Sequence, residues 1–413
     1  MASRRTFLSC VAGTAVAAHL AFPQRRSPGL ALYANVGPVL THYDADSGNA
    51  ELIQRESVTL PAAVQYAWPH RDRRHFYVAS SDNVPGSAQA GTKHHVTAFR
   101  IDPVTGALSQ IGDPMRLPAR PIHLTLDHES QHILVAFNDP SSLRVYRIND
   151  DFSPGPDVPQ ATMDTGIYAH QVRVTPDGRH VVLVTRGNEG TTQRPEDPGA
   201  LMVFDYKTGV LSNQYKIAPN GGRGYGPRHL DFHPTEPWMY VSIETQNQMH
   251  MHRMQGGKPL PEVVFNKSTL LEPSNIRSRQ AASAVHVDPN GRFVYGANRS
   301  QDVVDFNGKK VYKGGENSIV VYSINQQTGE PNAIQHIETN KVHPRTFHID
   351  PSGRMLVAQH NLPMDVRDGD KVRTVSAGLS VFRMGADGKL TLARTYDVDV
   401  GDKSMWWMGM VPL

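Results

Sequence analysis

The chain has 413 residues, of which 34 are Gly and 30 are Pro, and this composition argues against a helical bundle and favours many short strands joined by turns. A single cysteine, Cys10, excludes a disulfide framework and a cysteine-based zinc or iron–sulfur site. A net charge of only +3, with no basic run, argues against a nucleic-acid partner.

The first 22 residues have the features of an export signal. Arg4 and Arg5 precede an almost charge-free run, as in the twin-arginine pattern, and residues 15–17 (Ala-Val-Ala) offer a cleavage site. The run is too short and too rich in Ala and Gly for a membrane span. We therefore expect residues 1–22 to be a twin-arginine signal peptide, recognised by the twin-arginine export machinery, and the mature protein to be periplasmic. The alternative is an ordinary secretory signal or an uncleaved anchor.

An internal repeat runs through the rest of the chain. Its unit is an apolar strand, a turn of the form Asp-Pro-x-Gly-Arg and a second β-rich strand. Pro and Asp initiate such a turn and Gly supplies its positive φ, so each copy predicts a hairpin. Clear copies begin at Val174, Val287 and Ile349, and degenerate copies begin at Trp68, Leu126 and Phe232.

The repeat predicts a β-propeller. A third strand follows several hairpins, as at residues 96–101, 319–324 and 379–384, and a fourth follows these. Four antiparallel strands are the unit of a propeller blade. The turn anchors are spaced about 56 residues apart, so the roughly 391 residues of 23–413 accommodate about seven blades. The six anchors are Pro69, His128, Pro176, Pro234, Pro289 and Pro351.

The seventh blade must be divided between the two ends of the chain. Residues 30–35 and 39–43 are typical of its later strands, and residues 404–411 of a lone innermost strand. Closing the ring in this way removes exposed sheet edges. We therefore predict a single all-β domain over residues 23–413, a seven-bladed propeller of four-stranded antiparallel blades closed by strands from both termini. A solenoid is the competing interpretation, but neither end resembles a capping repeat.

Charged residues recur at two positions of the repeat. Six residues before the anchor stand His170, Arg228, Ser283 and Arg345, and ten residues after it stand Arg186, Glu244 and Arg299. A hairpin places these two positions side by side, so all seven residues should meet at one mouth of a central channel. Unpaired buried charge is costly, and the pattern therefore predicts an anion-binding pocket with one acid/base pair. The alternative is an ion-pair network that only ties the blades together.

Other motifs carry less weight. His250 and His252 alternate along a strand that we expect to be exposed, without a third ligand nearby, so we expect no metal and no cofactor. The loop at residues 221–226 (Gly-Gly-Arg-Gly-Tyr-Gly) lacks the features of a phosphate loop but leads directly to Arg228 and could shape a pocket lid.

Three motifs resemble those of a known family. The segments at residues 226–234 (beginning Gly-Pro-Arg-His), 289–299 (ending Ala-Asn-Arg) and 344–351 (beginning Pro-Arg-Thr-Phe) are similar to those of the seven-bladed β-propeller lactonases. That family includes propeller-type 6-phosphogluconolactonases and carboxy-cis,cis-muconate lactonizing enzymes. The resemblance implies a site of one His, one Glu and two Arg, which fit His170, Glu244, Arg228 and Arg299 here, with Arg345 as a further pocket residue.

The resulting hypothesis is a metal-independent lactonase acting on a sugar-acid or carboxylated lactone. Arg228 and Arg299 would hold the substrate and stabilise an oxyanion, while Glu244 and His170 would share the general-base and general-acid roles, with Arg345, Arg186 and Ser283 binding substrate. The alternatives are the reverse cyclisation of a carboxymuconate-like diacid, and a non-catalytic propeller scaffold. We expect a monomer.

Overall fold

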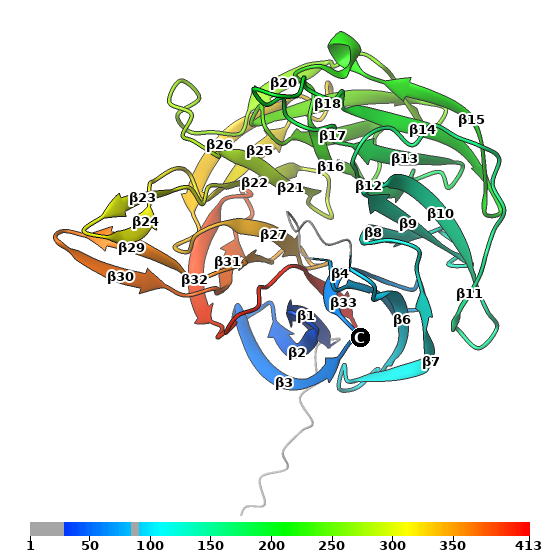
Figure 1. Ribbon diagram of the computed structural model, residues 1–413, viewed down its shortest axis with the longest axis horizontal. Helices are drawn as coiled ribbons and strands as arrows, with labels where there is room; N and C mark the ends of the chain where they lie inside the picture. Colours follow the sequence, from blue (N-terminus) through cyan, green and yellow to red (C-terminus); the bar gives the residue numbers. More distant parts are fainter. Residues whose placement is uncertain (1–28, 84–90) are drawn as a thin grey trace, which may run out of the picture.

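The fold is a seven-bladed β-propeller. The computed structural model describes residues 29–83 and 91–413, which form seven antiparallel sheets arranged around a central axis (Figure 1). The expected signal peptide, residues 1–22, lies outside the described residues. The described part contains one short 3-10 helix, Pro219–Gly222, and no helix there is long and apolar enough to cross a membrane. The predicted all-β class is confirmed.

Blades 1 to 3 follow each other along the chain, and their strands run in order from the axis outward. Blade 1 consists of β4 (Ala63–Pro69), β5 (His75–Ser81), β6 (His94–Ile101) and β7 (Leu108–Arg116). Blade 2 consists of β8 (Pro121–Leu126), β9 (His132–Asn138), β10 (Ser141–Ile148) and β11 (Pro154–Asp157). Blade 3 consists of β12 (Ala169–Val174), β13 (His180–Thr185), β14 (Ala200–Lys207) and β15 (Val210–Ile217).

Blades 4 to 6 continue the ring, with short additions. Blade 4 consists of β16 (Pro227–Phe232), β17 (Trp238–Ile243), β18 (Gln248–Gln255) and β20 (Phe265–Ser268), and β19 (Lys258–Pro259) also pairs with β18. Blade 5 consists of β21 (Ala281–Val287), β22 (Phe293–Arg299), β25 (Ser318–Ile324) and β26 (Pro331–Glu338). Blade 6 consists of β27 (Pro344–Ile349), β28 (Met355–His360), β31 (Gly378–Met384) and β32 (Leu390–Asp397).

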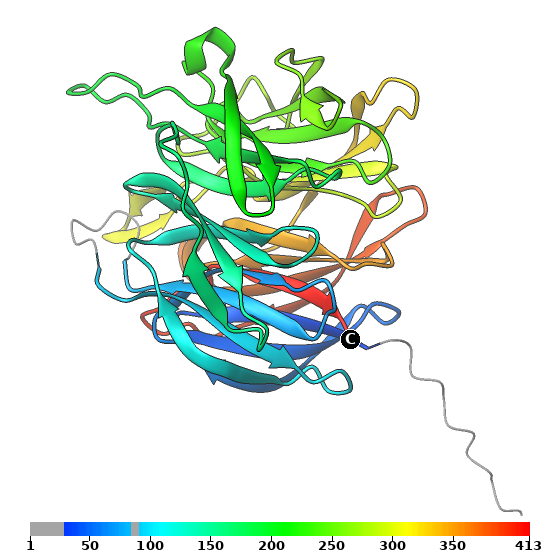
Figure 2. The same cartoon turned by 90° about the vertical axis from the view of Figure 1, so that its right-hand side faces the viewer.

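Blade 7 joins the two ends of the chain. Its inner strand β33 (Met408–Pro412) pairs antiparallel with β1 (Leu30–Val36), which is followed outward by β2 (Val39–Asp46) and β3 (Glu51–Thr59). Figure 2 shows the C-terminus beside these N-terminal strands. The predicted closure is confirmed, but the predicted inner strand at residues 404–411 began too early. The amides of Trp406 and Trp407 instead bond to the side chain of Asn35, at 3.0 and 2.8 Å.

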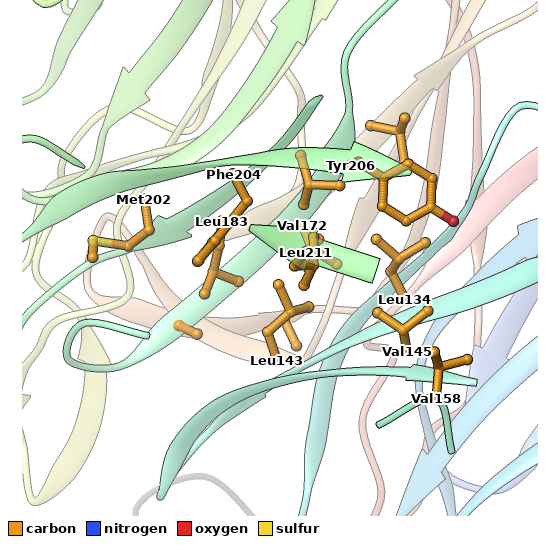
Figure 3. Close-up of a cluster of buried hydrophobic side chains, with 14 of the residues drawn as sticks. Leu134, Leu143, Val145, Val158, Val172, Leu183, Met202, Phe204, Tyr206 and Leu211 are labelled. Carbon is orange, nitrogen blue, oxygen red and sulfur yellow. The ribbon is translucent and has the colours of Figure 1, made fainter. Parts of the chain in front are cut away.

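The hydrophobic core lies between neighbouring blades. The second strand of each of blades 1 to 6 is buried along its whole length, because both of its faces pack against an adjacent blade. Figure 3 shows one such interface, where Leu134 and Val145 of blade 2 pack with Val172 and Leu183 of blade 3. Burying one such side chain stabilises the fold by about 1.5–3 kcal/mol.

The turn between the first two strands has the predicted chemistry. In blade 5, Asp288 Oδ1 accepts the backbone N–H groups of Arg292 and Phe293, both at 2.7 Å, and Gly291 has a φ of 67°. Only a residue that tolerates positive φ closes this turn without strain. The repeated Asp-Pro-x-Gly-Arg motif therefore marks the hairpin that begins a blade.

A β-bulge interrupts the pairing of the inner strand in each of blades 1 to 6. The register shifts within the first few residues of that strand, where the chain lies at the end of the ring that we call the mouth. A bulge redirects the side chain of the extra residue. The residues at the bulges are Gln65, Ile122, His170, Arg228, Ser283 and Arg345.

Two hairpins are inserted at the mouth side of blades 5 and 6, each between the second and third strands. They are β23 (Val303–Phe306) with β24 (Lys309–Tyr312), and β29 (Met364–Asp368) with β30 (Lys371–Val375). The two hairpins lie side by side and project from the ring (Figure 1), and the Arg367 guanidinium lies 4.6 Å from the Phe306 ring centroid.

Candidate active site

The bulges bring the inner-strand candidates to one end of the axis. His170 of β12, Arg228 of β16, Ser283 of β21 and Arg345 of β27 are all bulge residues at the mouth. Since the second strand runs back toward the mouth, the other candidates lie where that strand ends. Arg186 directly follows β13, Glu244 directly follows β17, and Arg299 is the last residue of β22.

The predicted anchor of the first repeat copy, Pro69, is wrong by two residues. In each copy the residue after the inner strand donates its backbone N–H to the first carbonyl of the second strand, and in blade 1 this bond joins His70 to His75. The equivalent of the other anchors is therefore Arg71, because Pro69 itself ends the inner strand β4. Six residues before Arg71 stands Gln65, the bulge residue that the misalignment concealed.

Glu244 is the centre of a buried ion cluster. Its carboxylate, only 6% exposed, pairs with Arg299, with Arg186 Nη1 at 3.2 Å and with Arg228 Nε at 3.5 Å. Burial raises the pKa of Glu244, but the positive charges of Arg299, Arg186 and Arg228 outweigh it and lower the pKa to about 2. Glu244 is therefore an anion at neutral pH and has no proton to donate.

A small cavity lies beside this cluster, at the mouth end of the axis. Its volume is about 20 Å³, which is room for about one water molecule. Side chains from five blades and from the segment before β33 form its walls: Gln65, Tyr66, Ile122, His170, Arg228, His229, Arg345, Thr346, Trp406 and Trp407. Arg228 belongs to both the cavity wall and the ion cluster, and so joins the two.

Positive charge exceeds negative charge around the cavity. Arg228 is 1% exposed, and its Nε and Nη1 atoms have no hydrogen-bond partner among the described residues, nor has Nε of Arg299. Burial and the nearby Arg299 lower the pKa of Arg228 to about 9. Arg120 donates to Gln65 Oε1 at 2.9 Å, but its Nη2 also lacks a partner there. Buried donors without partners are costly, so this arrangement favours a bound anion.

The histidines at the cavity are neutral. His170 is buried, its Nδ1 has no hydrogen-bond partner among the described residues, and its ring centroid lies 5.1 Å from that of His229. Burial and then Arg228 lower the pKa of His170 well below its ordinary value. A neutral imidazole in the cavity wall can accept a proton from a water molecule held beside it.

Two of the predicted site residues, Ser283 and Arg186, contact other protein groups and do not line the cavity. The Ser283 hydroxyl donates to the backbone carbonyl of Arg345 at 2.6 Å, so it supports Arg345. Arg186 does not line the cavity; its guanidinium lies 4.4 Å from the Tyr168 ring centroid and reaches Glu244.

Sequence reasoning missed Gln65, Arg120 and Trp406. Correct alignment of the first repeat copy would have identified Gln65. Arg120 directly precedes the inner strand β8 and Trp406 shortly precedes β33. Both therefore lie at the mouth but outside the two repeat positions that carry the other candidates.

The Gly-rich loop at residues 221–226 packs against the segment at 187–199. The Gly224 N–H donates to Glu196 Oε1 at 2.7 Å, and the Gly199 N–H donates to the Gly222 carbonyl at 3.0 Å. Gly199 has no space for a side chain, because an added Cβ would lie 2.0 Å from the Tyr225 carbonyl. The loop thus holds the chain that enters β16 just before Arg228.

One cluster has ligand types suited to a metal ion. His70, Asp72 and His75 offer ligand atoms within 4.8 Å of one another, in the first turn of blade 1. His70 Nδ1, however, accepts the Asp72 N–H at 3.2 Å, and in the equivalent turn of blade 4 His233 Nδ1 accepts the Thr235 N–H at 3.3 Å. The cluster therefore has the hydrogen bonding of a turn cap.

His250 and His252, expected on an exposed strand, are buried on β18 because this strand packs between blades.

The comparisons with known proteins agree with this architecture. The model of the family "Lactonase, 7-bladed beta-propeller" matches residues 32–363. A 6-phosphogluconolactonase from Bacillus subtilis is 28% identical over 315 residues, which is 72% of this chain and 81% of that protein. The periplasmic gluconolactonase PpgL of Pseudomonas aeruginosa superposes with a TM-score of 0.69 at 20% identity, over 93% of this chain and 98% of that chain. A Bacteroides fragilis structure has a TM-score of 0.70 at 18% identity, over 94% and 100% of the two chains. The family match covers most of the chain, and the protein therefore belongs to the lactonase family of seven-bladed β-propellers.

Proposed function

We propose that this protein is a lactonase that hydrolyses an anionic lactone, a sugar-acid or carboxylated lactone, at the mouth cavity. The observation that carries the proposal is the set of buried guanidinium donors without partners on Arg228, Arg299 and Arg120, beside a single carboxylate and a neutral histidine. The 6-phosphogluconolactonase relative and the match to the family support the same reaction class.

The arginines supply electrostatic stabilisation. When water adds to the lactone carbonyl, negative charge develops on the carbonyl oxygen, and the free Nη1 of Arg228 is a preorganised donor for it. Arg345 and Arg120, which have no carboxylate partner among the described residues, would bind a further anionic group of the substrate.

His170 is the better candidate for the proton transfers. It lines the cavity, whereas Glu244 does not, and Glu244 is held as an anion by three arginines. His170 would take a proton from the attacking water as the hydroxyl oxygen bonds to the carbonyl carbon. It would return that proton to the alkoxide that leaves when the ring C–O bond breaks, giving the open hydroxy acid. Glu244 then acts as a positioning residue for Arg228 and Arg299.

The imidazolium formed in this step lies close to arginines, which disfavour it. The developing oxyanion and the anionic group of the substrate add negative charge at that moment and so offset the repulsion. The scheme requires no metal. We further propose that the protein acts in the periplasm and is a monomer. The periplasmic location is supported by the twin-arginine pattern at residues 1–22 and by the structural neighbour PpgL, a periplasmic gluconolactonase.

A proton-release assay of the purified protein tests the proposal. The panel contains gluconolactone, 6-phosphogluconolactone, an aldarolactone and a carboxymuconolactone, each with wild type, His170→Asn and Glu244→Gln. We expect turnover of at least one anionic lactone, and a loss of about 10²–10⁴ in kcat for His170→Asn. Because the pKa of His170 lies below the ordinary value of a histidine, wild-type activity should stay constant as the pH falls through about 6.5. It should decline only in more acidic solution.

Glu129→Gln is the matched control, since Glu129 forms an exposed ion pair with Arg71 away from the mouth. It should retain wild-type activity. If no lactone is consumed by any variant, or if His170→Asn turns over as fast as wild type, hydrolysis by this site is refuted. A protein that instead consumes a carboxymuconate diacid would be a lactonizing enzyme, and a folded protein without either activity would be a scaffold.

A further inference from the structure

Two wall residues of the cavity, Arg345 and Trp406, contact each other. The Arg345 guanidinium carbon lies 3.3 Å from the ring centroid of Trp406, so the guanidinium lies directly over the indole ring. Arg120 lies 5.5 Å from the same ring. With its wall residues in this arrangement, the cavity holds about one water molecule and has no room for a lactone ring. Substrate binding at this site therefore requires a side chain to move.

The backbone beneath Trp406 is firmly held. Asn35 Oδ1 accepts the N–H groups of both Trp406 and Trp407, at 3.0 and 2.8 Å, and the Met405 N–H donates to the Asn361 carbonyl at 3.0 Å. Asn35 is fully buried, and its own amide donates to the Gly37 carbonyl at 2.9 Å. The indole is thus presented at the mouth by a rigid segment.

The side chain of Arg345 has weaker restraints. Its backbone carbonyl is held by Ser283, but its guanidinium forms no ion pair or hydrogen bond with any described residue. A cation–π contact with the Trp406 ring holds it instead. Arg228, Arg299 and Arg120 all repel it electrostatically, and only Glu244 attracts it, with a smaller effect. An incoming anion could therefore draw this guanidinium away at little cost.

We propose that Arg345 and Trp406 form a substrate-operated gate, and that Trp406 is a specificity-determining residue. This inference rests on the proposed function. The anionic group of the substrate pairs with Arg345 and removes it from the indole face. The exposed face of Trp406 then stacks on the lactone ring, whose C–H groups present an apolar surface. A neutral lactone lacks the group that opens the gate, so the device selects anionic substrates by their charge and by their ring.

Tryptophan fluorescence tests the gate without requiring turnover. Gluconate, 6-phosphogluconate and inorganic phosphate are titrated as probes, with neutral glucose as the reference. We expect the anions to change the emission of the wild type and glucose to leave it unchanged. The change should be lost in Trp406→Phe. In Arg345→Met the emission of the free protein should already be altered, and the response to anions should be abolished.

Trp68→Phe is the matched control. Trp68 lies three residues beyond Gln65 along β4, and an arginine, Arg173, also lies over its ring at 5.2 Å, but it does not line the cavity. This variant should keep the full response. Both Trp406→Phe and Arg345→Met should also melt near the wild-type temperature, so that a lost response does not reflect unfolding.

A response that persists in Trp406→Phe would overturn the gate, as would a wild-type protein that responds to none of the anions. Either result can coexist with lactone turnover that depends on His170 in the proton-release assay. In that case the proposed function stands and the gate alone fails. With a functional gate, Trp406→Phe should raise KM for the anionic lactone several-fold with a smaller effect on kcat.

Discussion

At the scale of single residues, Glu244 decides the electrostatic character of the mouth. Its three arginine partners come from blades 3, 4 and 5, so one carboxylate links three consecutive blades. In a purely structural ion pair, the hydrogen-bond donors and acceptors of both side chains would all have partners. Here Arg228 and Arg299 keep unpaired donors after pairing with Glu244, and this surplus distinguishes a binding site from a tie between blades.

The lowered pKa of Glu244 predicts how its stabilising effect depends on pH. The pKa falls from an ordinary value near 4.5 to about 2 in the folded protein, which corresponds to about 3 kcal/mol. A group with a depressed folded pKa stabilises the fold above its unfolded pKa and loses this effect as the pH falls toward the folded pKa. We therefore expect Glu244→Gln to be less stable than wild type at neutral pH, with a difference that shrinks between pH 4.5 and 2.

Urea unfolding of the two proteins across that pH range measures this difference. Other carboxyl groups titrate in both proteins and cancel in the comparison. The exposed Glu129→Gln should follow the wild-type curve in parallel. If the Glu244→Gln curve is also parallel to that of wild type throughout, the ion cluster does not lower the pKa of Glu244.

At the scale of elements, the bulge at the start of the inner strand is the feature that builds the site. The same irregularity recurs in six blades, and each time it turns one side chain to the mouth. In blade 5 this residue is Ser283, whose hydroxyl supports the carbonyl of Arg345, and whose own carbonyl accepts the hydroxyl of Ser242 at 2.7 Å. These hydrogen bonds therefore connect the second strand of blade 4, β17, to the inner strands of blades 5 and 6.

Replacing Ser283 distinguishes support of Arg345 from direct substrate binding. Ser283→Ala removes one buried hydrogen bond, and we expect it to lower the free energy of unfolding by about 1 kcal/mol. Its kcat/KM for the anionic lactone should fall less than that of Arg345→Met, because the Arg345 guanidinium remains present. A loss of kcat/KM that equals that of Arg345→Met, with unchanged stability, would place the Ser283 hydroxyl on the substrate.

The elements also show how far the sequence predicts this molecule. The hairpin turn is local chemistry of Asp, Pro and Gly, so its repetition predicts the blades and their number. The closure at Leu30–Val36 follows because an incomplete blade must be completed by the other end. Bulges and the approach of Trp406 to Arg345 depend on packing between distant strands, and the misplaced anchor at Pro69 shows that a Pro ending a strand can imitate a turn. The inserted hairpins β23–β24 and β29–β30 lie outside the repeat, and so the repeat carries no signal for them.

At the scale of the whole molecule, ring closure and the candidate site are built by the same residues. β33 closes the ring through its pairing with β1, and the two residues before it, Trp406 and Trp407, form part of the cavity wall. The ring therefore has to be closed before the pocket is complete. Asn35 of β1 lies at this junction, because its side-chain Oδ1 accepts hydrogen bonds from the backbone N–H groups of both Trp406 and Trp407.

Asn35→Ala should weaken closure and pocket together. The variant leaves one buried and one partly buried N–H group without a partner, at about 1–3 kcal/mol for each, so we expect the free energy of unfolding to fall by roughly 2–6 kcal/mol. Urea unfolding measures this loss, and Asn49→Ala, which removes an exposed amide bonded to Asp46, is the control with little expected effect. Because Trp406 loses its anchor, KM for the anionic lactone should rise in conditions where the variant is still folded. A variant with reduced stability but unchanged KM would mean that the C-terminal strand closes the ring without shaping the pocket, and that the wall formed by Trp406 is dispensable for substrate binding.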